Sequence, residues 1–231
     1  SQYGYTLIPK EFDLFAYEYV LVSNPLFLRS LWNSIYITVV GTFLMVVNTT
    51  LFSYALTKKE LVGRKFFSFY AIFTMLFAGG TIPYYLVVTG IGLDQSLWAI
   101  ILPGAFAPFS VFLLTKSMRR IPVSLIESAK LDGAGEWHIF WNICLPQCRS
   151  ALYSIAILVF IDYWNMVEQP LILLPDASQQ PLSVYLSQIN AGEIGIAFAA
   201  AVIYMVPGLL MFLHGEAYLV EGITYAGSVK G

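Results

Sequence analysis

Charged side chains are scarce in this chain of 231 residues. Asp, Glu, Lys and Arg together make up 11% of it, whereas hydrophobic residues make up 58%. A soluble domain carries about a quarter charged residues, so this composition is typical of a chain surrounded mostly by lipid. The net charge of −2 gives no overall attraction to nucleic acid, and we expect no nucleic-acid partner.

Groups that carry chemistry are equally sparse. Cys144 and Cys148 have no histidine pair at metal-ligand spacing beside them, so we interpret them as reduced thiols rather than a zinc site. The chain lacks the G-x-x-x-x-G-K loop that binds nucleotide phosphates, and it lacks the G-x-S-x-G and H-E-x-x-H motifs of hydrolases. We therefore expect no catalytic residue, no metal site and no enzymatic activity in this chain.

Long apolar runs are abundant. A helix of about 20 apolar residues can cross a bilayer, and five segments reach this length without the alternation of barrel strands. They are Leu31–Thr57, Phe66–Thr89, Ser96–Thr115, Ala151–Leu173 and Ile194–His214. The sequence thus predicts an all-α, polytopic transmembrane helical bundle, with residues 1–30 as an extracytoplasmic lead-in and residues 31–231 as one transmembrane domain.

The distribution of Lys and Arg predicts the orientation of these spans. Basic residues gather in the loop after the first span, in the loop after the third and behind the fifth, whereas residues 90–95 and 174–193 contain none. The positive-inside rule then places the basic loops and the C-terminus in the cytoplasm. An outside N-terminus without a signal sequence needs an earlier span to deliver it. We therefore expect a sixth helix to precede this chain, the alternative being that Ser1 is the true start.

The loop 117–147, between the third and fourth spans, is polar but patterned. Pro122 suits a helix start, Ser124 and Glu127 have the spacing of a capping box, and Gly133 suits a left-handed helix end. A second short helix is predicted over Glu136–Cys144, stopped by Pro146. Its apolar face carries Trp137, Phe140, Trp141 and Cys144. Such a pair can form a stiff knob that passes force to the spans, or merely an amphipathic surface loop.

This loop resembles the EAA loop of ABC importer permeases. Glu127-Ser128-Ala129, Gly133 and Ile143-x-Leu145-Pro146 follow one another at the family's spacing, with Ser128 in place of the middle alanine. Further segments are similar to the carbohydrate, maltose-transporter-type branch of the family. They include Leu31-Trp32-Asn33-Ser34, Leu131-Asp132-Gly133-Ala134, Trp164-Asn165 and the ending Val220-Glu221-Gly222-Ile223-Thr224.

The resemblance implies a type I ABC importer permease fold in the bacterial inner membrane. It implies a second homologous permease, two ATPase subunits that hold ATP and magnesium, an extracytoplasmic solute-binding protein and a sugar substrate, with no cofactor in this chain. It also implies a site at which the ATPases dock. The residues assigned to this docking and coupling site are Glu127, Ser128, Ala129, Asp132, Gly133, Ile143, Leu145 and Pro146.

Polar residues within the fourth span are candidates for the substrate path. Ionisable groups inside a membrane usually face protein or water, because exposing them to lipid is costly. The candidates are Asp162, Trp164, Asn165 and Glu168. The alternatives are a hydrogen bond between helices, or for Glu168 a position at the outer interface. In the outer loop, a short helix over Pro181–Gln188 is predicted, as a docking surface for the binding protein or as a passive connector.

Two other functions remain open on sequence grounds. The loop motif also suits a permease for a peptide or a polyamine, although the similarity to the carbohydrate branch favours a sugar. A membrane scaffold that transports nothing is the other alternative, but it has no need of an ATPase-docking knob.

Overall fold

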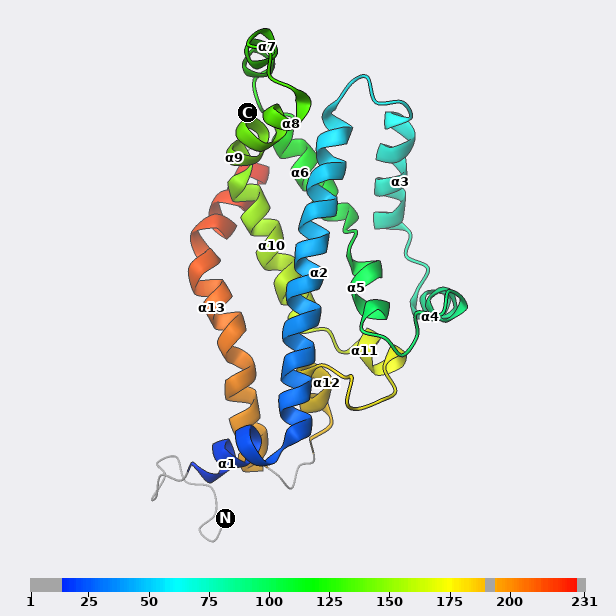
Figure 1. Ribbon diagram of the computed structural model, residues 1–231, viewed down its shortest axis with the longest axis vertical. Coiled ribbons are helices and arrows are strands. Elements are labelled where there is room, and N and C mark those ends of the chain that lie inside the picture. Colours follow the sequence, from blue (N-terminus) through cyan, green and yellow to red (C-terminus); the bar gives the residue numbers. More distant parts are fainter. Residues whose placement is uncertain (1–13, 190–193, 228–231) are drawn as a thin grey trace.

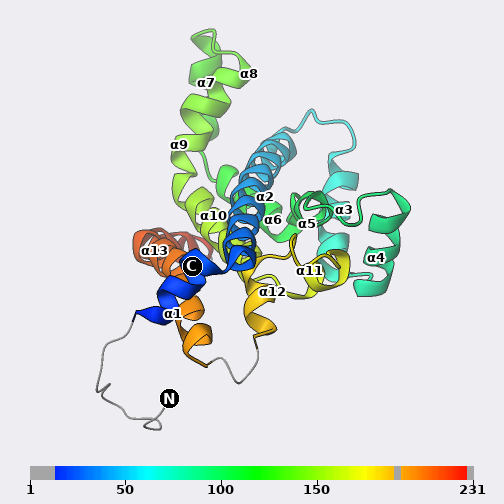
Figure 2. The ribbon, with the colours of Figure 1, turned by 60° about the horizontal axis from the view of Figure 1, so that its bottom comes forward.

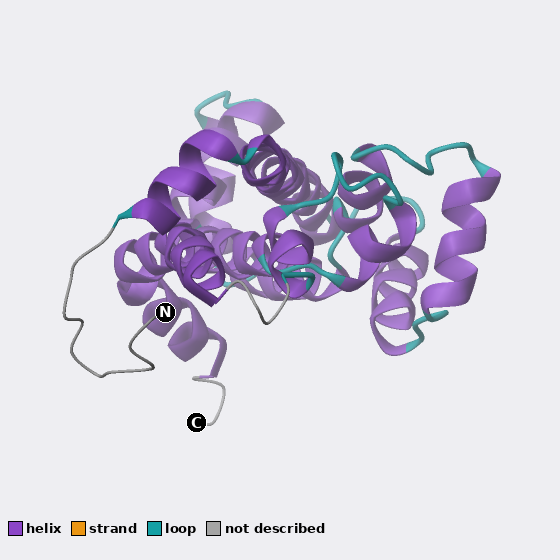
Figure 3. Cartoon of the chain, turned by 90° about the horizontal axis from the view of Figure 1, so that it is seen from below, coloured by secondary structure: helices purple, strands orange, loops and turns teal. Residues whose placement is uncertain are grey.

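The computed structural model describes residues 14–189 and 194–227, and that part of the chain is helical throughout, with loops but no strands (Figures 1 and 3). Three long helices lie side by side as the main body: α2 (Pro25–Thr57), α10 (Arg149–Trp164) and α13 (Ile194–Gly227). Residues 1–13 of the predicted lead-in, residues 190–193 of the outer loop and Lys230, the basic residue behind the last predicted span, lie outside the described residues.

Shorter helices surround this body. They are α1 (Phe15–Glu18), the π-helix η1 (Tyr19–Ser23), α3 (Arg64–Leu76), α4 (Thr81–Gly90), α5 (Trp98–Gly104), α6 (Pro108–Met118), α7 (Val123–Leu131), α8 (Glu136–Ile139), the π-helix η2 (Phe140–Cys144), α9 (Leu145–Gln147), α11 (Glu168–Leu173) and α12 (Leu182–Ser187).

Helix α2 begins at Pro25, earlier than the predicted start at Leu31. Asn24 caps it, because its side-chain oxygen accepts a hydrogen bond from the backbone N–H of Phe27 at 3.1 Å. Pro25 occupies the first helical position, where its fixed φ suits a helix and its missing N–H costs nothing. The helix rises about 50 Å over its length, more than the hydrocarbon core of a bilayer.

Small side chains let the helices approach one another closely. The buried small and polar residues of α2 are Ser30, Ser34, Thr38, Gly41, Thr49, Thr50 and Ser53. A Cβ atom added at Gly41 would lie 2.6 Å from Cζ of Tyr163. The hydroxyl of Tyr163 donates a hydrogen bond to the carbonyl of Ile101 at 3.1 Å. Tyr163 therefore joins α2, α5 and α10, in the manner of membrane helices that pack through small residues.

The span predicted over Phe66–Thr89 is interrupted, as the sequence predicts from Gly79, Gly80 and Pro83 late in this segment. Helix α3 ends at Leu76 and α4 begins at Thr81, with Gly79 and Gly80 between them. Gly80 has φ +82°, a left-handed conformation that no helix can continue through and that glycine adopts without a steric penalty.

The predicted helix Ala151–Leu173 is also interrupted. Helix α10 ends at Trp164, and the six-residue α11 begins only at Glu168. Pro170 lies in the first turn of α11, where its missing N–H is tolerated, whereas in the interior of one continuous helix it would remove a hydrogen bond. Here the sequence signal was hydrophobicity, which continues across the break.

The number of membrane-spanning segments follows from helix length and composition. Among the described residues, three helical segments suffice to cross a membrane: Pro25–Thr57, Trp98–Met118 and Ile194–Glu216. The pair Glu136–Gln147 and Arg149–Trp164, bent by 76°, gives a fourth if it is one span. The second predicted span along the chain, Phe66–Thr89, covers the broken α3 and α4 and stays a prediction.

The two basic loops lie at the same end of the molecule. Figure 1 places α7, α8, the connection from α2 to α3 and the C-terminal end of α13 at one end, and α1 and α12 at the other. Side chains from both loops line one cavity of about 470 Å³, among them Lys58, Arg64, Arg119 and Lys130. The fold therefore gathers the positive charge that the sequence shows in separate segments.

The predicted short helix in the outer loop is present as α12, but it is packed into the bundle. Leu182 and Val184 are buried, and the backbone N–H of Leu182 donates to the hydroxyl of Ser34 at 2.7 Å. Asn33 holds the preceding loop by donating to the carbonyls of Ser178 and Gln180. The loop is thus fastened to the start of α2.

Candidate functional site: a projecting loop and two cavities

Helix α7 stands at the extreme end of the molecule, beyond the bundle (Figures 1 and 2). None of its residues is buried. Its last turn closes at Asp132, and Gly133 follows with φ +82°, which confirms the predicted left-handed helix end. The N–H of Ala134 then bonds to the carbonyl of Ala129 at 2.9 Å, so the turn after α7 is fixed by backbone hydrogen bonds.

The predicted capping box at the start of α7 is wrong. Pro122 is the N-cap residue and no side-chain capping bond occurs. Because the helix starts at Val123, Ser124 already lies inside its first turn, and the carbonyl of Ser124 accepts a hydrogen bond from the hydroxyl of Ser128 at 2.8 Å. The hydroxyl of Ser128 thus bonds within its own helix.

The residues assigned to docking and coupling fall into two groups. Glu127, Ser128, Asp132 and Gly133 are exposed on α7 and its end. Ala129, Ile143 and Leu145 are half-buried and pack against the main hydrophobic core, whereas Pro146 is exposed. The arrangement leaves one set of side chains exposed while a second set holds the loop on the bundle.

The second part of the loop differs from the predicted helix. It starts at Glu136 as predicted, but α8 passes into η2 and then α9, and the chain stays helical to Gln147. Pro146 does not stop it, because it stands in the first turn of α9, where a proline is tolerated. Phe140 is buried, as an apolar anchor should be, whereas Trp137 and Trp141 are 67% and 61% exposed.

Two of the four substrate-path candidates lie together at the end of α10. The indole N–H of Trp164 donates to the carbonyl of Tyr204 at 3.1 Å, and the hydroxyl of Tyr204 donates to Oδ1 of Asn165 at 2.7 Å. The rings of Trp164 and Tyr204 are stacked, with centroids 5.6 Å apart. These residues line a cavity of about 300 Å³ between α10 and α13.

Glu168 lines a different and larger cavity, of about 630 Å³, at the break between α3 and α4. Its carboxylate accepts a hydrogen bond from the hydroxyl of Thr81 at 2.7 Å. Tyr84 and Gln169 also line this cavity. The fourth candidate, Asp162, is exposed on α10 and lines neither of the two. The helix breaks thus create a wall with carboxylate, amide and hydroxyl groups.

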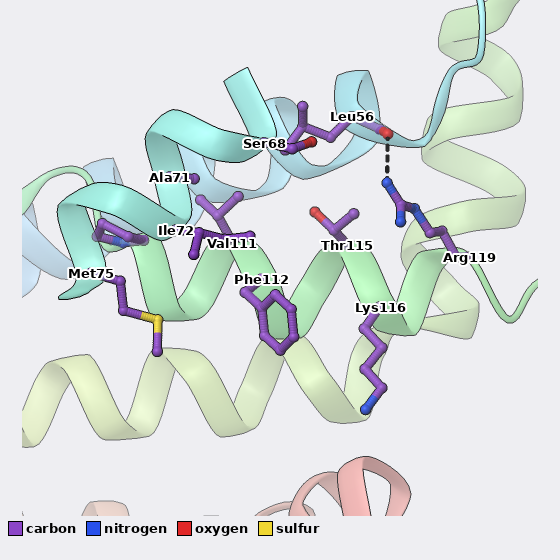
Figure 4. A pocket seen from close by; sticks show the side chains of 11 residues that line it. Leu56, Ser68, Ala71, Ile72, Met75, Val111, Phe112, Thr115, Lys116 and Arg119 are labelled. Carbon is purple, nitrogen blue, oxygen red and sulfur yellow. Dashed lines mark hydrogen bonds between the residues drawn. The ribbon is translucent and has the colours of Figure 1, made fainter. Parts of the chain in front are cut away.

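Another cavity, of about 340 Å³, lies between α3 and α6 (Figure 4). Its lining is mostly apolar, with Met75, Val111 and Phe112 on its walls. Arg119 closes one end, where its guanidinium donates to the carbonyl of Leu56 at 3.3 Å. This bond connects the end of α6 to the end of α2, directly beneath the projecting loop.

Sequence reasoning missed the contacts that hold the loop to α2. Lys58 served only as a marker of orientation and Glu136 only as a helix start, yet the two form an ion pair. They are 78 residues apart, so no local pattern connects them. The available signal was that the two residues carry opposite charges and lie in loops predicted to be on the same side of the membrane.

Comparison with known proteins identifies the family. The family model "Binding-protein-dependent transport system inner membrane component" matches residues 22–217. The chain is 37% identical to Protein LplC of Bacillus subtilis, over 100% of this chain and 83% of that protein. It is 36% identical to the polygalacturonan/rhamnogalacturonan transport system permease protein YtcP of the same organism, over 98% and 85% of the two chains.

The fold is similar to that of a solved relative. A chain in the crystal structure of a bacterial ABC transporter involved in the import of the acidic polysaccharide alginate superimposes with a TM-score of 0.84 at 28% identity, covering 91% of this chain and 81% of that one. With its projecting loop, helical bundle and family match over most of its length, the chain belongs to the inner membrane components of binding-protein-dependent transport systems.

Proposed function

We propose that this chain is a permease subunit of an ATP-driven importer that moves a sugar or oligosaccharide into a bacterial cell. Its relatives support the substrate class, since their names include permeases for polygalacturonan or rhamnogalacturonan and for arabinooligosaccharides. The family is that of a transport component, and the chain is therefore not itself an enzyme. ATP and magnesium belong to separate ATPase subunits.

In this proposal the chain contributes five spans, and six are present in the full protein. The end that carries α7 and the cluster of basic side chains faces the cytoplasm, together with the C-terminus, by the positive-inside rule. The opposite end, with α1 and α12, faces the extracytoplasmic binding protein. A second, homologous permease completes the path across the inner membrane.

The observation that carries the mechanism is the projection of α7 from the basic end. A short helix with exposed Glu127, Ser128 and Asp132, fixed at Gly133, is suited to fit into a cleft of a separate ATPase subunit. When two ATPases close on ATP, α7 moves with them and the spans tilt relative to one another, so that the translocation path opens to the outside. Hydrolysis of ATP returns the translocation path to the inward-open state.

The sugar path runs along the wall made by the helix breaks. Thr81, Tyr84, Glu168 and Gln169 offer hydroxyl, carboxylate and amide groups to sugar hydroxyls. Trp164 and Asn165 line a second cavity, between α10 and α13. Asp162, exposed on α10, lines neither cavity and is included in the path only as an ionisable group within the predicted span. Substrate sites of transporters commonly lie where membrane helices are broken, because the freed backbone groups and polar side chains meet there.

Reconstitution of the complex with its co-purifying chains tests the proposal. We expect two ATPase subunits, a second permease and a binding protein to co-purify or to restore function, and a sugar to stimulate ATP hydrolysis in vesicles. Charge reversal in Glu127→Lys should leave membrane insertion intact and abolish uptake. Stimulation by a peptide or a polyamine and not by any sugar would refute the substrate class, and the absence of any ATPase partner would refute transport by this mechanism.

A further inference from the structure

One carboxylate connects three elements beneath the projecting loop. Oε2 of Glu136 accepts hydrogen bonds from Nζ of Lys58 at 2.5 Å and from the hydroxyl of Tyr54 at 2.7 Å. Oε1 of the same group accepts from Nζ of Lys130 at 3.1 Å. We call these four residues the Glu136 clasp. Tyr54 and Lys58 lie at the end of α2, Lys130 lies on α7, and Glu136 begins α8.

The α2 side of the clasp is firmly held. Nζ of Lys58 lies 4.3 Å from the centre of the Tyr54 ring, a cation–π contact that adds to its ion pair. The Tyr54 ring in turn packs against Phe140, with centroids 4.9 Å apart, and Phe140 is buried. The guanidinium of Arg119 fixes the same end of α2 through the carbonyl of Leu56.

The α7 side has few other supports. No residue of α7 is buried, and only its half-buried Ile126 and Ala129 reach the hydrophobic core. The position of α7 relative to α2 therefore depends on these two apolar contacts, on the bond from Lys130 to Glu136 and on the turn at Gly133. Since the two oxygens of one carboxylate hold the two sides, a displacement of α7 pulls on the same group that holds α2.

We propose that the Glu136 clasp is the joint through which a displacement of α7 is passed to the spanning helix α2. Glu136 is thus a positioning residue for coupling, which contacts neither the sugar nor the ATPase. This inference rests on the proposed function of the chain. The side chain of Lys58 is 23% exposed and that of Lys130 is 52% exposed, so the α2 half of the clasp is the better shielded and the stronger one.

Glu136→Gln tests the clasp, because it keeps the shape of the side chain and removes only its charge. In the reconstituted complex, we expect normal ATPase co-purification and normal basal ATP hydrolysis, with the sugar imported per ATP lowered about fivefold or more. Lys58→Met should act like Glu136→Gln, and Lys130→Met should have a smaller effect. Glu60→Gln, which removes a carboxylate of the same basic end, is the matched control and should behave as wild type.

A charge swap distinguishes a positioning role of Glu136 in coupling from a role in protein stability alone. The triple variant Lys58→Glu, Lys130→Glu and Glu136→Lys reverses both ion pairs of the clasp and should regain most of the lost coupling. A wild-type ratio of sugar to ATP in Glu136→Gln would overturn the clasp. Parallel loss of complex and uptake, or no rescue by the swap, would also overturn it. If the wild-type complex contains no ATPase at all, the proposed function fails instead.

Discussion

Replacement of Gly133 by alanine is the most informative single change in the projecting loop. Gly133 ends α7 with φ +82°, and no atom lies within 4 Å of the position that a Cβ would take. The substitution therefore introduces no clash with a neighbour. Its whole effect comes from the backbone, which an alanine disfavours in this conformation.

The magnitude follows from that conformation. An L residue in the left-handed region costs about 1–2 kcal/mol relative to glycine. The protein can release this strain by adopting a different turn after α7. The fraction of molecules that keep α7 in its native position then falls by a factor of about 5–30. We expect uptake to fall by a similar factor in Gly133→Ala. Gly133→Asn should lose less, because asparagine tolerates this conformation better.

Two other glycines serve as controls in the same chain. Gly135 lies two residues further with φ −71° and open space around it, so Gly135→Ala should be nearly neutral. Gly92 has φ +72° and open space, but it lies between α4 and α5, away from α7 (Figure 1). Gly92→Ala should therefore carry a similar strain without loss of coupling.

The assay is sugar uptake into vesicles at matched levels of all subunits, together with the amount of ATPase that co-purifies. Normal uptake in Gly133→Ala would refute the reasoning. So would an equal loss in Gly92→Ala, because the strain would then act on the general fold and not on the placement of α7.

Three further predictions address the bundle, the path and the clasp. Gly41→Ala forces a Cβ against the ring of Tyr163, and we expect about 1–3 kcal/mol of destabilisation, seen as a lower thermal unfolding temperature of the purified complex. Thr81→Val removes the hydroxyl that donates to Glu168; we expect about 1 kcal/mol weaker sugar binding and about fivefold more sugar for half-maximal uptake, with unchanged subunit assembly. The hydrogen bond from Lys58, with smaller contributions from Tyr54 and Lys130, lowers the pKa of Glu136 to about 2 from its usual 4.5, so the clasp persists above pH 4.5 and is lost only as the pH falls toward 2. The ratio of wild-type to Glu136→Gln uptake should thus stay constant over about pH 6 to 8, and a change in that range would count against an ionised clasp.

The sequence predicted the helical class and the loop at the basic end because both depend on local signals. Hydrophobic runs of sufficient length predicted α2, α6 and α13, and a glycine after a short amphipathic run predicted the end of α7 at Gly133. Where several local signals competed, the prediction failed. Pro122 displaced the expected cap at Ser124, since a proline with an extended ψ already begins the helix before the serine.

The break after α10 and the contacts between distant segments were beyond sequence reasoning, whereas Gly79 and Gly80 predicted the break between α3 and α4. Average hydrophobicity stays high across Pro170, so it does not register where the backbone leaves a helix. The separation of Glu168 from Trp164 into different cavities follows from the break after α10. The pairing of Lys58 with Glu136 needs the three-dimensional meeting of two loops, which a single sequence does not encode in any spacing.

Photo-cross-linking from the tip of the loop tests the central claim most directly. A cross-linking residue at Leu131, 89% exposed at the end of α7, is compared with one at Val22, 74% exposed at the opposite end of the molecule. In native membranes the account predicts that position 131 captures an ATPase subunit on the cytoplasmic side and that position 22 does not. Capture of an ATPase from position 22, or labelling of position 131 by a reagent that stays outside the cell, would contradict it.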